Sequence, residues 1–296
     1  MWGFFKRILK DFSEDECSVR AAALAYYTVF ALPPLLILLI TVVGIFWDPA
    51  EVQRSLELQF SSLVGDQGGR AIRDMLASVE RPGAGGPVTT GLGIAALLFG
   101  AIGAFMQLQG ALNRAWEVKP DPKQGGIRRF VAKRLLSAGM ILAVAFLLLV
   151  SFAVSALISS LGARMTFMPA PALHAIDMVT SFAVITTLFA AIYKILPDAE
   201  VGWRDVWLGA LVTSMLFVVG KFAIGFYLGR STPGDAFGAA GALAVILVWI
   251  YYAGMIVLFG AEFTQAWAER RGAAIRPEKG AIHVELRQVE LGPPRA

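Results

Sequence analysis

Four charged side chains stand alone inside long apolar segments of this 296-residue chain: Asp177, Lys194, Lys221 and Glu262. Ionisable groups at such positions are costly to bury in a membrane, and they usually face a protein interior or a wet cavity. Such residues can bind an ion, a proton or a polar part of a substrate. We therefore take them as candidate polar sites of an intramembrane or transport process.

Charged residues at similar predicted depths in the membrane could be partners. With a rise of 1.5 Å per residue, Asp177 lies roughly 9 Å, and Lys221 roughly 12 Å, inside the external ends of their helices. This predicts an ion pair between Asp177 and Lys221. In the alternative, Lys221 extends to the membrane surface and Asp177 lies in a wetted vestibule. The sequence favours neither arrangement.

Glu262 falls at the opposite, inner ends of the helices. Three bases are predicted at the same level, and one or more of them could neutralise it: Arg20, Arg114 and Lys194. A clamp between helices, without transport chemistry, is the favoured interpretation because such pairs also fix packing.

Sequence motifs for enzymatic chemistry are absent. The chain lacks a nucleotide-binding loop ending in Lys-Ser/Thr, a His-Glu-x-x-His zinc motif and a Gly-x-Ser-x-Gly elbow. Its two histidines, His174 and His283, are predicted on opposite sides of the membrane, and Cys17 is the only cysteine. We expect no enzymatic activity, no metal and no cofactor.

The elements that position these residues are apolar helices. Hydrophobic residues make up 57% of the chain and charged residues 16%, against about 25% charged in soluble domains. About 20 apolar residues span a bilayer as a helix, and a helix bonds its own backbone groups there. We predict an all-α polytopic membrane protein, with one six-helix domain at 1–268 and a flexible cytoplasmic tail at 269–296. The six predicted spans are 21–47, 88–112, 135–161, 172–196, 206–229 and 236–262.

Basic residues orient the chain. Lys and Arg are enriched before the first span and after the second, fourth and sixth, which predicts cytoplasmic N- and C-termini. The basic segment 113–134 would then face anionic lipid. Nucleic acid is disfavoured as a partner, because no recognition module accompanies the charge. The sequence leaves open a homo-oligomer or an envelope protein as a further partner.

Two segments outside the spans have helical periodicity. In 2–12, apolar residues recur at helical spacing and basic residues occupy the other face of the helix. This pattern predicts a helix that lies in the membrane interface. The external segment 48–87 predicts an amphipathic helical hairpin around a turn at 65–69, capping the bundle. Within the first span, Pro33 and Pro34 remove two backbone donors and predict a kink or break. Glycines such as Gly100 and Gly103 predict close helix packing.

Several longer strings carry a family resemblance. They are AAALAYYTVFALPP at 21–34, NRAWEV at 113–118, IYKILPD at 192–198, FGAAGAL at 237–243, and WIYY with FGAEF at 249–263. In this order they resemble the YihY/BrkB family of bacterial inner-membrane proteins, historically mislabelled ribonuclease BN. Besides Pro34, Arg114 and Glu262, the positions that match the family's pattern are Tyr26, Tyr27, Asn113, Trp116, Tyr193, Pro197, Gly238, Gly241, Tyr252 and Gly260.

The resemblance implies a six-helix protein of the bacterial cytoplasmic membrane. One branch of the family is connected with export of a lipopolysaccharide precursor, which favours a transporter or lipid-translocating protein in envelope biogenesis. A non-transporting scaffold that recruits envelope partners is the alternative. A ribonuclease is disfavoured, because no metal-ligand set for phosphodiester hydrolysis is visible.

Overall fold

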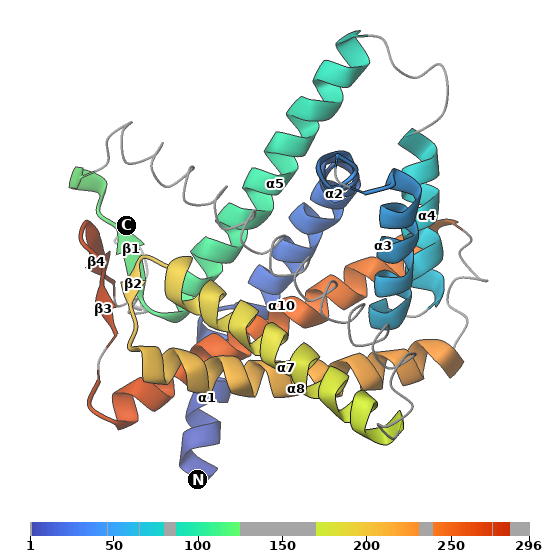
Figure 1. Ribbon diagram of the computed structural model, residues 1–296. Helices are drawn as coiled ribbons and strands as arrows, with labels where there is room; N and C mark the ends of the chain where they lie inside the picture. The colour runs from blue at the N-terminus through green and yellow to red at the C-terminus, as the bar shows by residue number, and fades with distance from the viewer. Residues whose placement is uncertain are drawn as a thin grey trace, which may run out of the picture.

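A computed structural model describes residues 2–45, 47–64, 66–79, 87–124, 170–230, 239–273 and 275–284. The described chain is mainly helical (Figure 1). Its helices are α1 (Trp2–Glu14), α2 (Cys17–Val43), α3 (Pro49–Val64), α4 (Asp66–Val79), α5 (Pro87–Ala115), α7 (Ala170–Ile195), α8 (Trp203–Arg230) and α10 (Ala239–Arg270). Its short strands are β1 (Val118–Pro120), β2 (Ala199–Glu200), β3 (Arg276–Pro277) and β4 (Ala281–His283).

Five of the six predicted spans coincide with long helices, namely α2, α5, α7, α8 and α10. The sixth, 135–161, lies outside the described residues. Among the described segments, three are long and apolar enough to cross a membrane: Met178–Ile195, Trp203–Ile224 and Leu243–Arg270. Their outer surfaces expose large apolar side chains, as a lipid-facing surface does. These include Met178, Val179, Leu211, Met215, Val219, Phe222 and Val248.

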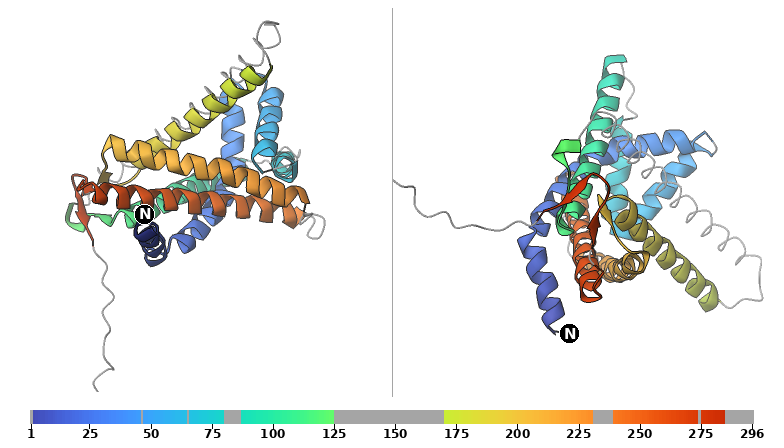
Figure 2. Two further views of the ribbon diagram at one scale, coloured as in Figure 1. Left: turned by 90° about the horizontal axis from the view of Figure 1, so that it is seen from below. Right: turned by 90° about the vertical axis from the view of Figure 1, so that its left-hand side faces the viewer.

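The long helices converge at one end of the molecule. There the last turns of α5, α7 and α10 meet the first turns of α2 and α8, and we call this the basal end. Helices α8 and α10 pack along each other, and α2 packs against both α10 and α5, whereas α5 runs away from α10 at an angle (Figures 1 and 2). The main hydrophobic core lies at the basal end, around Trp116, Tyr193 and Leu258.

The double proline does not break the first span. Helix α2 is continuous across Pro33 and Pro34. Its axis nevertheless bends, because Figure 1 shows its first part across the view and its last part end-on. Neighbouring helices hold such a bend when they pack on both sides of it. Both α5 and α10 pack against α2.

Two amphipathic helices, α3 and α4, occupy the predicted hairpin segment. Helix α4 already begins at Asp66, so four of the five residues predicted as a turn are helical. The helices approach closely at Gly69, where an added Cβ would meet the Ser61 hydroxyl. Ile72 and Leu76 of α4 are buried in a cluster with residues of α2 and α10, so this segment is part of the bundle.

The segment after α10 is more ordered than the predicted flexible tail. Gly272, with a φ of 73°, follows the helix, and β3 and β4 come next. Strand β4 pairs antiparallel with β1, and β3 pairs with β2. The polar composition of this segment favours a flexible tail. However, the backbone groups of β3 and β4 pair with strands in the loops after α7 and α5, and composition does not reveal such partners. We call the four strands the terminal clasp.

Candidate functional site

Five polar residues form a cluster at the basal end, which we call the basal cluster: Asp15, Cys17, Arg20, Arg114 and Glu262. Glu262 is only 2% exposed. The Cys17 thiol donates to its Oε1 over 3.4 Å, and the Asp15 carboxylate is its acidic neighbour. The turn between α1 and α2 brings Asp15 and Cys17 against α10. The cluster therefore holds two acidic side chains close together, one buried (Glu262) and one partly buried (Asp15).

The three predicted neutralising bases bond elsewhere. Arg114 Nε lies 2.9 Å from Asp15 Oδ1, though without hydrogen-bond geometry. Arg20 Nε donates to the Asp15 carbonyl oxygen over 3.0 Å. Lys194 donates to the Val201 carbonyl oxygen over 2.6 Å and lies over the Trp203 ring. Among the described residues, none of the three bases forms an ion pair with Glu262.

Asp15 has the electrostatics of a partly buried acid. Burial is the largest influence and raises the pKa of its carboxyl above the ordinary value. Arg114 opposes the rise, Glu117 adds to it, Arg20 opposes it, and Asp11 adds to it. Burial favours the neutral form of an acid, and the guanidinium groups of Arg114 and Arg20 do not fully offset that cost here.

A second polar group fastens the helix ends beside the basal cluster. Asn113 Nδ2 donates to Asp198 Oδ2, and the Asp198 backbone N–H donates to Asn113 Oδ1, both over 2.8 Å. The Glu278 backbone N–H from the terminal clasp donates to the Asp198 carbonyl oxygen. Trp116 Nε1 donates to the Ala261 carbonyl oxygen over 3.1 Å. Asn113, Trp116 and the Pro197 segment thus have a structural role in joining α5, α7 and α10.

Helices α8 and α10 interlock through two reciprocal contacts. An added Cβ at Gly209 would collide with Thr264, and one at Gly260 would collide with Thr213 and the Tyr193 hydroxyl. Each threonine donates to the carbonyl oxygen of the glycine four residues earlier on its own helix. The sequence reasoning picked out Gly260 and Tyr193 but missed Gly209, Thr213 and Thr264. A Gly-x-x-x-Thr spacing on both helices was the signal.

The Tyr193 hydroxyl completes this contact, since it donates to the Val257 carbonyl oxygen over 2.7 Å and lies 2.8 Å from the Thr213 hydroxyl oxygen. The remaining family-pattern tyrosines lie farther from the basal cluster. Tyr27 contacts Gly103 across α2 and α5, and Tyr252 covers Gly220 across α10 and α8. Tyr26 is exposed and contacts the Phe30 ring.

The predicted outer pair stays a prediction. Asp177 lies on α7 with a side chain outside the described set, and Lys221 is half-buried on α8. Gly238 also falls outside the described residues, and Gly241 lies in the first turn of α10.

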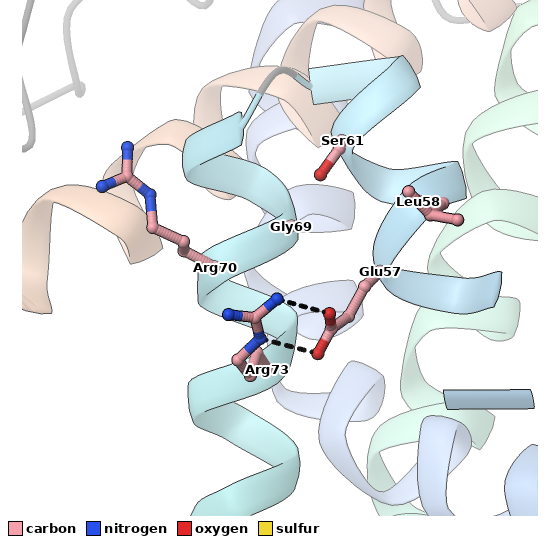
Figure 3. A pocket seen from close by; sticks show the side chains of 6 residues that line it. All are labelled: Glu57, Leu58, Ser61, Gly69, Arg70 and Arg73. Atoms are coloured by element: carbon pink, nitrogen blue, oxygen red, sulfur yellow. Dashed lines mark hydrogen bonds and ion pairs between the residues drawn. The ribbon is translucent and has the colours of Figure 1, made fainter. Parts of the chain in front are cut away.

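An open hollow of about 330 Å³ lies between α3 and α4 (Figure 3). Its main feature is a two-bond ion pair, in which Arg73 Nε donates to Glu57 Oε1 over 2.9 Å and Arg73 Nη2 to Glu57 Oε2 over 2.7 Å. This bonding lowers the pKa of the Glu57 carboxyl. Arg70, on the same helix, points away from the pair. The described residues contain no group of three or more His, Cys, Asp or Glu suited to a metal ion.

The chain is similar in sequence to a family of known proteins. A family model described as "Virulence factor BrkB" matches residues 8–282. A UPF0761 membrane protein of Alcanivorax borkumensis is 30% identical over 89% of this chain and 60% of its own length. A relative of that name from Alteromonas mediterranea is 26% identical over 91% of this chain and 88% of its own length. A UPF0761 membrane protein of Pseudomonas aeruginosa is 26% identical over 98% of this chain and 70% of its own length.

For several curated relatives, including the one from Alcanivorax borkumensis, the match to this chain covers only about three fifths of the relative's length. Their names give a membrane location and no activity. No solved structure matches the chain.

Proposed function

This chain is an integral membrane protein of the virulence factor BrkB family, and on that premise we propose that it moves a lipid or another amphiphile across the membrane in envelope biogenesis. The proposal places it in the bacterial cytoplasmic membrane with both termini in the cytoplasm. The basic residues after alternate spans support that orientation.

Burial of Glu262 in the basal cluster carries the proposal. Its side chain is 2% exposed on a long apolar helix, and its hydrogen-bond donor is a thiol, not a base. An acid that lacks direct neutralisation at membrane depth is costly, and in membrane proteins such acids mark pathways of ions, protons or substrate. A purely structural clamp would be cheaper with a directly paired base or with apolar residues.

The helix arrangement supports a moving bundle. Helix α5 diverges from α8 and α10 beyond the basal end, and the bent helix α2 packs against both α5 and α10. The basal end is held by hydrogen bonds between helices, so it is suited to act as the fixed end of a rearrangement.

Purified full-length protein in vesicles tests the proposal. The vesicles contain fluorescent phosphatidylglycerol or phosphatidylethanolamine, and a membrane-impermeant quencher reports lipid movement between leaflets. We expect the protein to accelerate movement of at least one lipid. Glu262→Gln should slow this movement about tenfold or more, which corresponds to ~1.4 kcal/mol of activation free energy.

Glu57→Gln is the matched control, because Glu57 lies on the surface between α3 and α4, away from the basal cluster. It should keep the wild-type rate. If folded Glu262→Gln is as fast as wild type, the role of Glu262 is wrong. If wild type moves neither lipid nor a lipopolysaccharide-type amphiphile but still captures envelope proteins, the scaffold function replaces the transporter.

A further inference from the structure

A groove of about 430 Å³ separates α1 from the last turns of α10. Its lining is Gly3, Phe4, Arg7, Ala266, Glu269 and Arg270. Helix α1 is held beside α10 by the ring contact of Phe12 with Phe259 and by the ion pair of Arg7 with Glu269. The groove therefore lies between two fixed helices.

Aromatic rings form one side of the groove. The Phe4 ring contacts Phe263 and Trp267 edge-on, with centroids 5.6 and 6.4 Å apart, and the latter two stack with an interplanar angle of 7°. The Arg270 guanidinium lies 5.6 Å from the Phe4 ring centroid. This placement adds a cation to an aromatic wall.

The two arginines of the groove differ in their partners. Arg7 is engaged by Glu269 and by Asp11. Arg270 is exposed, and among the described residues it has no acidic partner. A guanidinium with free donors matches the oxygens of a phosphate, which it can bind with two parallel hydrogen bonds.

Beyond the groove, α1 exposes apolar side chains, and one of them, Phe5, contacts the groove-lining Phe4 ring with centroids 6.0 Å apart. Trp2 is 84% exposed, Phe5 47% and Leu9 60%, although Ile8 on the same helix is fully buried. Lys6 lies exposed between them in the sequence. Large apolar side chains beside bases are the pattern of a helix that lies at the boundary of headgroups and acyl chains.

We propose that this groove binds an anionic phospholipid of the adjacent leaflet. Arg270 binds the phosphodiester, and the acyl chains lie along Phe4 and Phe5. A free phosphate would use the arginine but would leave the apolar face in water. This lipid is a bound component and not the transported molecule, so the inference is independent of the proposed transport.

Native mass spectrometry of delipidated full-length protein tests the site. The protein is titrated with phosphatidylglycerol, phosphatidylcholine or glycerol phosphate, and the apparent Kd of the tightest site is measured. We expect wild type to prefer phosphatidylglycerol and Arg270→Gln to weaken that binding about tenfold, with little effect on phosphatidylcholine. Phe5→Ser should weaken both lipids, because it removes acyl contact and keeps the charge.

Arg276→Gln is the matched control, since Arg276 is an exposed base of β3 near the same end. It should bind phosphatidylglycerol as wild type does. An equal loss in both arginine variants would mean general charge attraction and would overturn the site. So would unchanged binding in Arg270→Gln, or glycerol phosphate binding as tightly as the lipid. Unfolding temperatures of the variants show that each is folded.

Discussion

At the scale of single residues, the sequence places Glu262 at one end of the helix bundle but does not show which side chains lie beside it. Glu262 was identified as an unusual acid and placed at the level of Arg20, Arg114 and Lys194. The structure puts Cys17 and Asp15 beside it and directs the bases to other acceptors. Hydropathy gives a residue's position along a span, whereas its partner depends on how each helix is rotated, which only packing determines.

Asp15→Asn should change the pH dependence of stability. An acid with a raised pKa binds its proton more tightly in the folded state, so it lowers the free energy of unfolding as pH rises above about 3.9, its unfolded value. Relative to the Asn variant, wild type should therefore lose unfolding temperature between pH 4 and pH 7. Scanning fluorimetry in detergent measures the difference.

Glu57→Gln is the control, for which we expect the opposite change of stability with pH. The pKa of Glu57 is lowered by hydrogen bonding to Arg73, so wild type should gain stability relative to this variant as pH rises through the acid range. Identical pH profiles for the Asp15 variant and wild type would contradict the assignment of Asp15 as a partly buried acid.

At the scale of elements, the sequence predicted the long helices well and their contacts only partly. Gly100 and Gly103 were expected at a helix interface, and they do lie against Ala31 and Tyr27. Gly209 and its partner Thr264 were not foreseen. Small residues occur on several faces of these helices, and the sequence does not say which face meets a neighbour.

Gly209→Ala should destabilise the protein by about 1–3 kcal/mol, the usual cost of overfilling a tight contact. Its new methyl group would collide with the Thr264 side chain. Thr264→Ala removes the hydroxyl, so the double variant should recover part of the loss, with a coupling of about 1 kcal/mol in a double-mutant cycle.

Gly110→Ala serves as the comparison. Gly110 also lies in a helix, but an added Cβ meets nothing within 4 Å. It should be neutral or slightly stabilising, because alanine favours the helix. Additive effects of Gly209→Ala and Thr264→Ala would show that the two side chains do not compete for one space.

At the scale of the whole molecule, the terminal clasp was the part least accessible to sequence reasoning. Residues 276–277 and 281–283 are too few to show the alternating pattern of a strand. They are ordered by pairing with β1 and β2, which follow α5 and α7. The clasp thereby joins three segments that are distant in the chain at the basal end.

Deletion of residues 275–296 should lower the unfolding temperature and expose the segment around Val118 to protease. It removes the pairing of β1 with β4 and the bond from Glu278 to Asp198, at about 1 kcal/mol net for each hydrogen bond. Deletion of 285–296 alone keeps both and should leave the temperature unchanged. Equal temperatures for the two truncations would mean that the clasp does not stabilise the fold.

The clasp also sets an order of assembly during synthesis. Val118 in β1 pairs with His283 in β4. Because β4 follows α10 in the sequence, this pairing can form only after α10 has been synthesised. Until then, the loops after α5 and α7 lack the backbone partners that hold them in the finished protein. The nascent helices can therefore enter the membrane and adjust against one another before β3 and β4, which follow α10, pair with β2 and β1.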